Sequence, residues 1–223
     1  MLEIKSAVNA VLEYLREQII TIQLKPGAYL NENALSLHLN ISRPPIREAL
    51  QILEQERLVV SNPRRGRYVT EINEKNLTEI YEVRIMIECQ AIELLAKRDI
   101  KDFSKLEKAV NGALAFPIPS LENRKERLNF IITMENFHTF LVELVENELL
   151  SHFYRILRSN LLRYRYIYLF IPGMGNKFLQ EHCQLLNLIK KGEYSQAKSF
   201  LLTHMESSYQ LIKEKINQGL ENF

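Results

Sequence analysis

The sequence is poor in the residues that form cross-links, turns and membrane segments. Its 223 residues include two cysteines, Cys89 and Cys183, without CxxC spacing. We therefore expect no disulfide framework, and a reducing cytoplasm is the expected location. Seven glycines and seven prolines are low counts that favour long helices over many turns. No apolar run approaches the roughly 18 to 20 residues that span a bilayer, so no membrane segment is expected.

A strong net charge is also absent. The formal net charge is +2, and residues 1–74 contain nine basic and nine acidic side chains. Arginine is concentrated between Ser42 and Arg67, a segment with six arginines and three glutamates. Any contact with nucleic acid would therefore rest on a local patch rather than on a global positive field.

The first 40 residues predict two helices separated by a turn. Apolar residues recur at helical spacing over residues 8–22, and a Pro-Gly pair ends that helix. Asn31 is suited to cap a short second helix that runs to Leu39. Its buried face would consist of Leu39, Leu35 and Ala34.

A third helix begins with an unusually stiff first turn in “SRPPIREALQILEQ”. Ser42 is suited to be its N-cap. Pro44 and Pro45 fall in the first turn, where their missing N–H groups have no intrahelical partner to lose. Arg43 and Arg47 lie four residues apart and share one face near the N-terminal end.

Two β-rich runs follow in “RLVVSNPRRGRYVTEI” and predict a hairpin with basic residues at its tip. Three helices followed by a hairpin form a winged helix-turn-helix. A recognition helix meets the major groove with its N-terminal residues, where arginine can bind guanine through two hydrogen bonds. The alternative is that Arg43 and Arg47 only solvate a surface helix, but the turn, the cap and the basic hairpin together favour DNA binding.

The remainder of the chain is predicted to be almost wholly helical. Residues 1–72 are expected to form the first domain, residues 73–76 a short polar linker, and residues 77–223 a second, all-helical domain. Helices are expected at about 76–98, 102–114, 120–146, 148–171, 175–191 and 193–218. The fold class is therefore mainly α, with a winged helix-turn-helix followed by a bundle of six or seven helices.

Residues 15–69 contain a Pro-Gly turn, N-E-x-x-L, S-R-x-P-I-R-E-A-L and a hairpin ending R-G-x-x-V. In these motifs the first domain resembles the GntR family of bacterial transcription regulators. The resemblance implies that DNA is contacted or supported by Asn33, Ser42, Arg43, Pro45, Arg47, Arg64, Arg65 and Gly66. One departure is Arg57, where the family usually has glycine. A left-handed conformation would cost an arginine about 1 kcal/mol there, unless the helix ends differently.

The second domain resembles the FCD effector domain of the FadR branch in “LTEIYEVRIMIECQAIELLA”, “MENFHTFLVELVENELL” and “EHCQLLNLIKKGEYSQAKSFLLTHMESS”. Metal-binding members supply one aspartate and three histidines. His138, His182 and His204 match the histidine positions, whereas Met134 replaces the aspartate. A thioether is a poor ligand for hard divalent cations. Glu135 is adjacent in sequence to Met134 but rotated from it by about 100° around the helix, so it cannot simply replace the missing carboxylate.

The resemblance implies a small carboxylate, such as a sugar acid, as the effector. Arg84 is the first candidate for binding it, because a guanidinium fork matches a carboxylate. Asn160 is a second candidate, and Arg163 and Arg165 are weaker ones. The stripe Tyr164, Tyr166, Tyr168 and Phe170 is interpreted as packing. The three histidines either hold a divalent metal such as Zn²⁺ or Ni²⁺, bind an organic acid without metal, or are satisfied within the core.

These observations predict a homodimeric regulator that reads a palindromic site on double-stranded DNA, because a two-fold dimer imposes its symmetry on the operator. Repression is the default, since occlusion of a promoter needs no partner surface. The alternative is a constitutive or metal-only regulator with a degenerate sensor site. A hydrolytic enzyme would need a general base beside the metal, and no HExxH or comparable pairing occurs, so we expect no enzyme.

Overall fold

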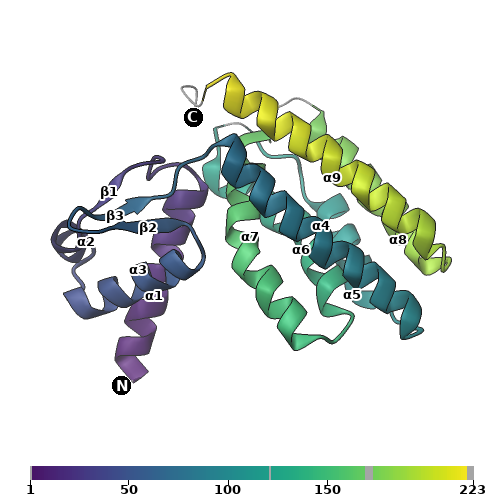
Figure 1. Cartoon of the computed structure of the whole chain (residues 1–223), viewed down its shortest axis with the longest axis horizontal. Coiled ribbons are helices and arrows are strands. Elements are labelled where there is room, and N and C mark those ends of the chain that lie inside the picture. Colours follow the sequence, from purple (N-terminus) through teal and green to yellow (C-terminus); the bar gives the residue numbers. More distant parts are fainter. Residues whose placement is uncertain (1, 121, 169–172, 220–223) are drawn as a thin grey trace. The chain divides into compact units, whose positions relative to one another are not determined.

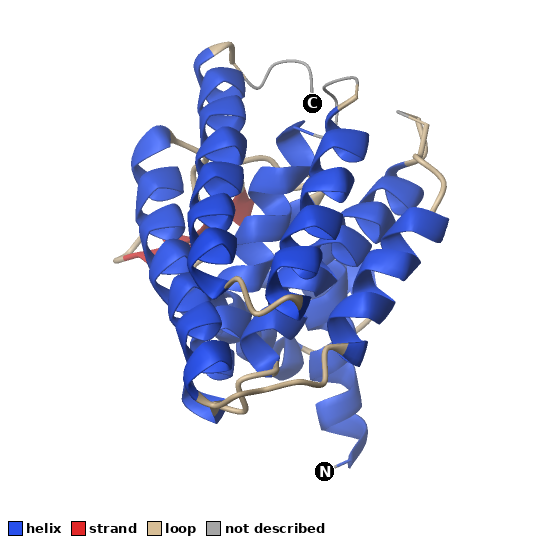
Figure 2. Cartoon of the chain, turned by 90° about the vertical axis from the view of Figure 1, so that its right-hand side faces the viewer, coloured by secondary structure: helices blue, strands red, loops and turns tan. Residues whose placement is uncertain are grey.

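The chain divides into two compact units, residues 1–72 (unit 1) and 73–223 (unit 2), and each is described by itself (Figure 1). The computed structural model describes residues 2–120, 122–168 and 173–219. Helices form most of both units, and the described strands belong to unit 1 (Figure 2). None of the described helices is long and apolar enough to cross a membrane.

Unit 1 contains three helices and a small antiparallel sheet. Its elements are α1 (Leu2–Ile20), β1 (Tyr29–Leu30), α2 (Glu32–Leu39), α3 (Arg43–Gln55), β2 (Val59–Asn62) and β3 (Gly66–Val69). The strand order is β1-β3-β2, so the hairpin strand β3 pairs on both sides. This is the predicted winged helix-turn-helix. The prediction missed β1, because a strand of two residues carries no detectable periodicity.

The core of unit 1 lies where α1 packs against α3. Helix α3 buries one face at helical spacing and exposes the other. Its buried residues are Pro45, Ile46, Ala49, Leu50 and Leu53. From α2, Leu35 and Leu39 pack against this core, whereas Ala34 is exposed. The expectation that Ala34 belongs to the buried face was therefore wrong, since a helix of eight residues turns only a narrow stripe inward.

The N-terminus of α3 is fixed by its prolines rather than by a side-chain cap. Ser42 occupies the N-cap position, but its side chain makes no capping hydrogen bond. A capping oxygen would accept from the backbone N–H of the second or third helical residue. Those residues are Pro44 and Pro45, which have no N–H group. Ser42 thus occupies the predicted N-cap position without a side-chain capping hydrogen bond.

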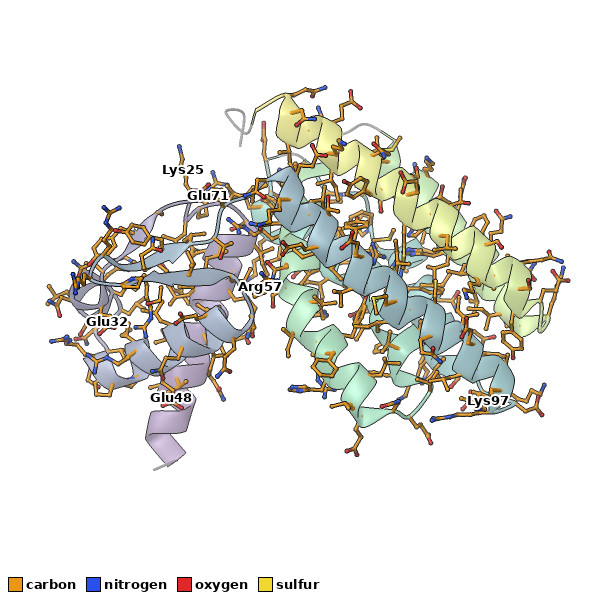
Figure 3. All side chains as sticks on the ribbon, in the orientation of Figure 1. Lys25, Glu32, Glu48, Arg57, Glu71 and Lys97 are labelled. Atoms are coloured by element: carbon orange, nitrogen blue, oxygen red, sulfur yellow. The ribbon has the colours of Figure 1, made fainter. Side chains whose placement is uncertain are left out.

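Arg57, labelled in Figure 3, follows the C-terminus of α3. Its backbone is in the left-handed conformation, with φ of 58°. The backbone N–H of Leu58 donates to the carbonyl oxygen of Leu53 at 2.9 Å, and that of Arg57 donates to Glu54 at 3.0 Å. These two hydrogen bonds form a Schellman motif, in which glycine is the usual left-handed residue. The helix therefore ends as in a glycine-capped protein, despite the arginine.

We expect Arg57→Gly to be more stable than Arg57→Ala by about 1 kcal/mol, because both variants lose the same side chain but only glycine adopts φ of 58° without strain. Urea unfolding of the two full-length variants measures the difference. Gln55→Gly against Gln55→Ala, in the last helical turn, is the control and should show the opposite order. Equal stability of the Arg57 variants would contradict the strain.

Unit 2 contains six described helices. They are α4 (Glu74–Lys97), α5 (Ser104–Ala115), α6 (Arg124–Glu143), α7 (Glu148–Tyr168), α8 (Met174–Lys190) and α9 (Tyr194–Asn217). Helix α4 packs against α6, α7 and α9, and α8 packs against α9. Side chains of α4 can therefore contact residues of α6, α7 and α9.

The residues predicted as a linker, 73–76, belong to the start of α4. The side chain of Asn73 accepts a hydrogen bond from the backbone N–H of Asn76 at 2.8 Å, and the helix begins at Glu74. This cap lets the helix form directly at the boundary of the unit. The polar composition that suggested a loop is that of a capped first helical turn.

Candidate functional site

A buried polar cluster lies inside unit 2 and receives side chains from five helices. Three of its members are His138 of α6, His182 of α8 and His204 of α9, which are 0%, 3% and 4% exposed. Their candidate ligand atoms all lie within 4.8 Å of one another. Residues separated by 66 positions in the sequence are thus brought together, as the resemblance implied.

Carboxylates orient two of these imidazoles. His138 Nδ1 lies 2.7 Å from Glu88 Oε2, and His204 Nδ1 lies 2.7 Å from Glu181 Oε2. Each Nδ1–H group therefore donates a hydrogen bond to its carboxylate, which leaves Nε2 unprotonated. His138 Nε2 lies 3.0 Å from His182 Nε2. A carboxylate behind each imidazole is the usual arrangement around histidines that bind metal.

The three histidines are held in their neutral form. Burial lowers the pKa of each imidazole well below its ordinary value, and the nearby cations Arg84 and Arg165 lower the pKa further. The neutral imidazole is the form that binds a metal ion. The site is therefore prepared for a metal or for a hydrogen-bonding ligand without a prior loss of protons.

A buried guanidinium lies directly beside the histidines. Arg84 of α4 is 0% exposed, and its Nε donates to Glu88 Oε1 at 2.7 Å. Its Nη2 lies 3.2 Å and 3.3 Å from the two ring nitrogens of His138. Among the described residues, Nη1 of Arg84 has no hydrogen-bond partner. A buried cationic donor without an acceptor is costly for the protein alone and suits an anionic ligand.

A second ion pair lies behind the first. Arg165 Nη1 pairs with Glu135 Oε2, and the Tyr154 hydroxyl lies 2.7 Å from Glu135 Oε1 and 3.1 Å from Glu88 Oε1. Glu135 is therefore engaged away from the histidines, in agreement with its predicted rotation around the helix. The two ion pairs, Arg84 with Glu88 and Arg165 with Glu135, are each neutral in formal charge.

Sequence reasoning missed Glu88, Tyr154 and Glu181 as members of the cluster. The spacing of Arg84 and Glu88, four residues apart on a predicted helix, was the available signal for the first. Tyr154 and Glu181 gave no signal, because their roles depend on how α7 and α8 pack. Glu88 contacts His138 at 2.7 Å, and Glu181 contacts His204 at 2.7 Å.

The other predicted residues of unit 2 have mixed placements. Asn160 and Arg163 are buried on α7. Tyr166 is buried and its hydroxyl accepts a hydrogen bond from Arg127 Nη2 at 2.6 Å, which fits the predicted packing role. Met134 is 8% exposed, one helical turn before the triad residue of α6. The side chain of Tyr168 and residue Phe170 lie outside the described residues.

The histidines fit a divalent metal ion with a small adjustment. Two nitrogens bonded to one zinc ion at about 2.0–2.1 Å can be separated by at most about 4.2 Å. The nitrogens of His138 and His182 satisfy this limit, whereas the 4.8 Å spread of the triad exceeds it slightly. Two carboxylate-bound imidazoles and a neutral third one make the triad a set that could hold a metal.

Unit 1 presents the predicted DNA-binding residues in two groups. Arg43 and Arg47 lie in the first half of α3, with side chains 56% and 54% exposed. Arg64 and Arg65 are exposed at the hairpin tip. Asn33 and Ser42 are exposed as well, whereas Pro45 is buried and can act only by fixing the helix start.

The hairpin needs glycine at position 66. Gly66 has φ of 96°, which side-chain-bearing residues rarely adopt. A Cβ atom there would lie 2.7 Å from Cε2 of Tyr29. The tip is closed by a 3.0 Å hydrogen bond from the backbone N–H of Arg65 to the carbonyl oxygen of Asn62. The turn therefore holds the two tip arginines in a defined place.

Comparisons with known proteins agree with both units. The chain is 28% identical over 209 residues to the HTH-type transcriptional regulator YdhC of Bacillus subtilis, covering 93% of this chain and 92% of that protein. It is 24% identical over 209 residues to the HTH-type transcriptional repressor RspR of Escherichia coli, covering 93% and 88%. Each alignment spans both units.

Solved structures share the fold. A GntR transcriptional regulator from Rhodococcus sp. RHA1 superposes with a TM-score of 0.74 at 23% identity, covering 93% of this chain and 97% of that one. The gntR model of bacterial regulatory proteins matches residues 7–69, and the FCD domain model matches residues 79–207. The second match alone spans more than half of the chain. The chain therefore belongs to the GntR family of bacterial transcription regulators, with an N-terminal helix-turn-helix and a C-terminal FCD domain, and is not an enzyme.

Proposed function

We propose that unit 2 senses a small carboxylate, such as a sugar acid, at the cluster formed by Arg84 and the three histidines. The observation that carries this proposal is Arg84 Nη1, a buried donor without a partner among the described residues, beside imidazoles held neutral. Arg84 would donate to one carboxylate oxygen. His138, His182 and His204 would hold a divalent ion such as Zn²⁺ or Ni²⁺.

The chain's own groups would orient this ligand. A bound ion would act as a Lewis acid that accepts an electron pair from a carboxylate oxygen of the ligand. Glu88 and Glu181 would keep the imidazoles of His138 and His204 turned toward the ligand, because each carboxylate accepts a hydrogen bond from an Nδ1–H group. Burial of the cluster would exclude water and strengthen each polar contact.

We propose further that Arg43 and Arg47 reach into the major groove and that Arg64 and Arg65 contact the DNA backbone. A homodimer would place two such helices on the half-sites of a palindrome. Carboxylate binding would change operator affinity through a coupling of about 1–3 kcal/mol, which is typical of allosteric pairs. Repression is the proposed outcome.

A second candidate is a regulator whose sensor no longer binds metal. Two observations favour it: Met134 offers a thioether where a carboxylate would bind metal, and the Arg84 guanidinium lies 3.2 Å from His138. A neighbouring cation repels a divalent ion. In this case Arg84 would donate to the carboxylate directly, because His138 and His204 already donate their single N–H groups to Glu88 and Glu181.

Met134→Asp is expected to tighten Zn²⁺ binding roughly tenfold or more, about 1.4 kcal/mol, because it adds a carboxylate one turn before His138. Competition with a chromophoric chelator measures the affinity. Thr133→Asp is the control, since it adds the same charge to α6 on a different face. An equal change in both variants, or none in Met134→Asp, would mean that the histidines do not form this metal site.

A further inference from the structure

The carboxylate of Glu32 lies among three arginines of α3 and β3, one of which, Arg67, also lies 3.6 Å from Glu54. Arg47 contacts Glu32 Oε2 through Nε at 3.3 Å and through Nη2 at 3.1 Å. Arg67 Nη1 donates to Glu32 Oε1 at 2.8 Å. Arg43 Nη2 lies 3.8 Å from Oε2. Glu32 of α2, labelled in Figure 3, thus contacts both α3 and the hairpin strand β3.

The carboxylate is held in place by its own helix. Glu32 lies in the first turn of α2, where Asn31 Oδ1 accepts hydrogen bonds from the backbone N–H groups of Asn33 and Ala34 at 2.9 Å and 3.1 Å. The Glu32 side chain is 21% exposed, and that of its partner Arg67 is 18% exposed. The inner half of the cluster is therefore sheltered, while the arginines of α3 remain more than half exposed.

This arrangement has two opposite consequences for DNA. Two N–H groups of Arg47 on one oxygen fix the guanidinium plane, so its outward edge is oriented before DNA arrives. A guanidinium that must form two hydrogen bonds to guanine benefits from such orientation. The same negative charge lies close to every phosphate that these arginines could approach, and it weakens contacts that carry no sequence information.

We propose that Glu32 is a positioning residue that sets the specificity of DNA binding: it orients Arg47 and Arg67 and suppresses non-specific phosphate contacts. This inference rests on the proposed placement of α3 in the major groove. Partly exposed ion pairs contribute little to folding stability. If Glu32 had only a structural role, its replacement would leave the discrimination between DNA sequences unchanged.

The experiment compares full-length Glu32→Gln with the wild type on two probes, a random-sequence duplex pool and the duplex that the wild type enriches from that pool. Affinity for the random pool should rise about fivefold, the factor for one charge pair about 4 Å apart in water. The ratio of affinities for the enriched duplex and the pool should fall about tenfold, within the range of one bidentate contact. Glu17→Gln, an exposed glutamate of α1, is the charge-matched control and should keep the wild-type ratio.

Glu32→Asp separates orientation from charge, because it keeps the charge and moves it back by one methylene. Glu32→Asp should retain the low affinity for the random pool but lose the preference for the enriched duplex over that pool. An unchanged ratio in both Glu32 variants would overturn the inference, as would an equal loss on both probes with reduced thermal stability. A wild type that enriches no duplex would instead overturn the proposed DNA contact itself.

Discussion

Replacing Arg84 with methionine is expected to destabilise the protein by about 3–5 kcal/mol. The guanidinium is fully buried and pairs with Glu88 at 2.7 Å. Removal of one partner leaves a buried carboxylate without its counter-charge, which is far more costly than loss of the ion pair as a whole. The free energy of unfolding of the metal-free full-length protein in urea measures the effect.

The double variant Arg84→Met/Glu88→Leu is the matched comparison. Removal of both charges should recover most of the lost stability, since a buried ion pair is often replaceable by apolar side chains of similar volume. The double variant should fold and bind no carboxylate, because it lacks both the Arg84 donor and the Glu88 carboxylate that orients His138. Additive losses in the double variant would contradict the pairing of Arg84 with Glu88.

Arg47→Ala is expected to weaken binding to the enriched duplex by about 1–3 kcal/mol, or roughly 5- to 150-fold, and to relax the preference for one base pair. The physical reason is the loss of a bidentate contact to a base edge from the N-terminal half of α3. Titration of that duplex and its single-base variants measures affinity and preference together. Unchanged affinity and preference would mean that another element reads the sequence.

Arg64→Ala tests the hairpin and serves as the contrast. A phosphate contact carries no sequence information, so the variant should bind all duplexes more weakly by the same factor. The slope of log affinity against log salt concentration should become shallower by about one. If Arg64→Ala altered base preference instead, the hairpin tip would be reading bases.

The sequence was most informative where a local rule decides the structure. The Pro-Gly turn, Asn31 as a cap and the apolar face of α3 predicted unit 1, because each acts within a few residues. The cap of α3 shows the limit of such rules. Ser42 was placed correctly, yet its hydrogen bond is absent because Pro44 and Pro45 remove the donors.

The candidate site in unit 2 was only partly predictable. His138, His182, His204 and Arg84 all followed from the resemblance. The partners Glu88 and Glu181 depend on which helices pack together, and no spacing in one sequence encodes that packing. The Glu32 cluster is similar, since its arginines come from α3 and from a strand that lies 35 residues away.

The most direct test of the account is the affinity of the full-length protein for its enriched duplex, measured with Zn²⁺ and a panel of small carboxylates that includes sugar acids. At least one acid should change operator affinity by roughly 5- to 150-fold in the wild type and have no effect on the Arg84→Met/Glu88→Leu variant. Equal operator affinity with every acid, with and without a chelator, would contradict the claim that the cluster of Arg84 and the three histidines controls DNA binding.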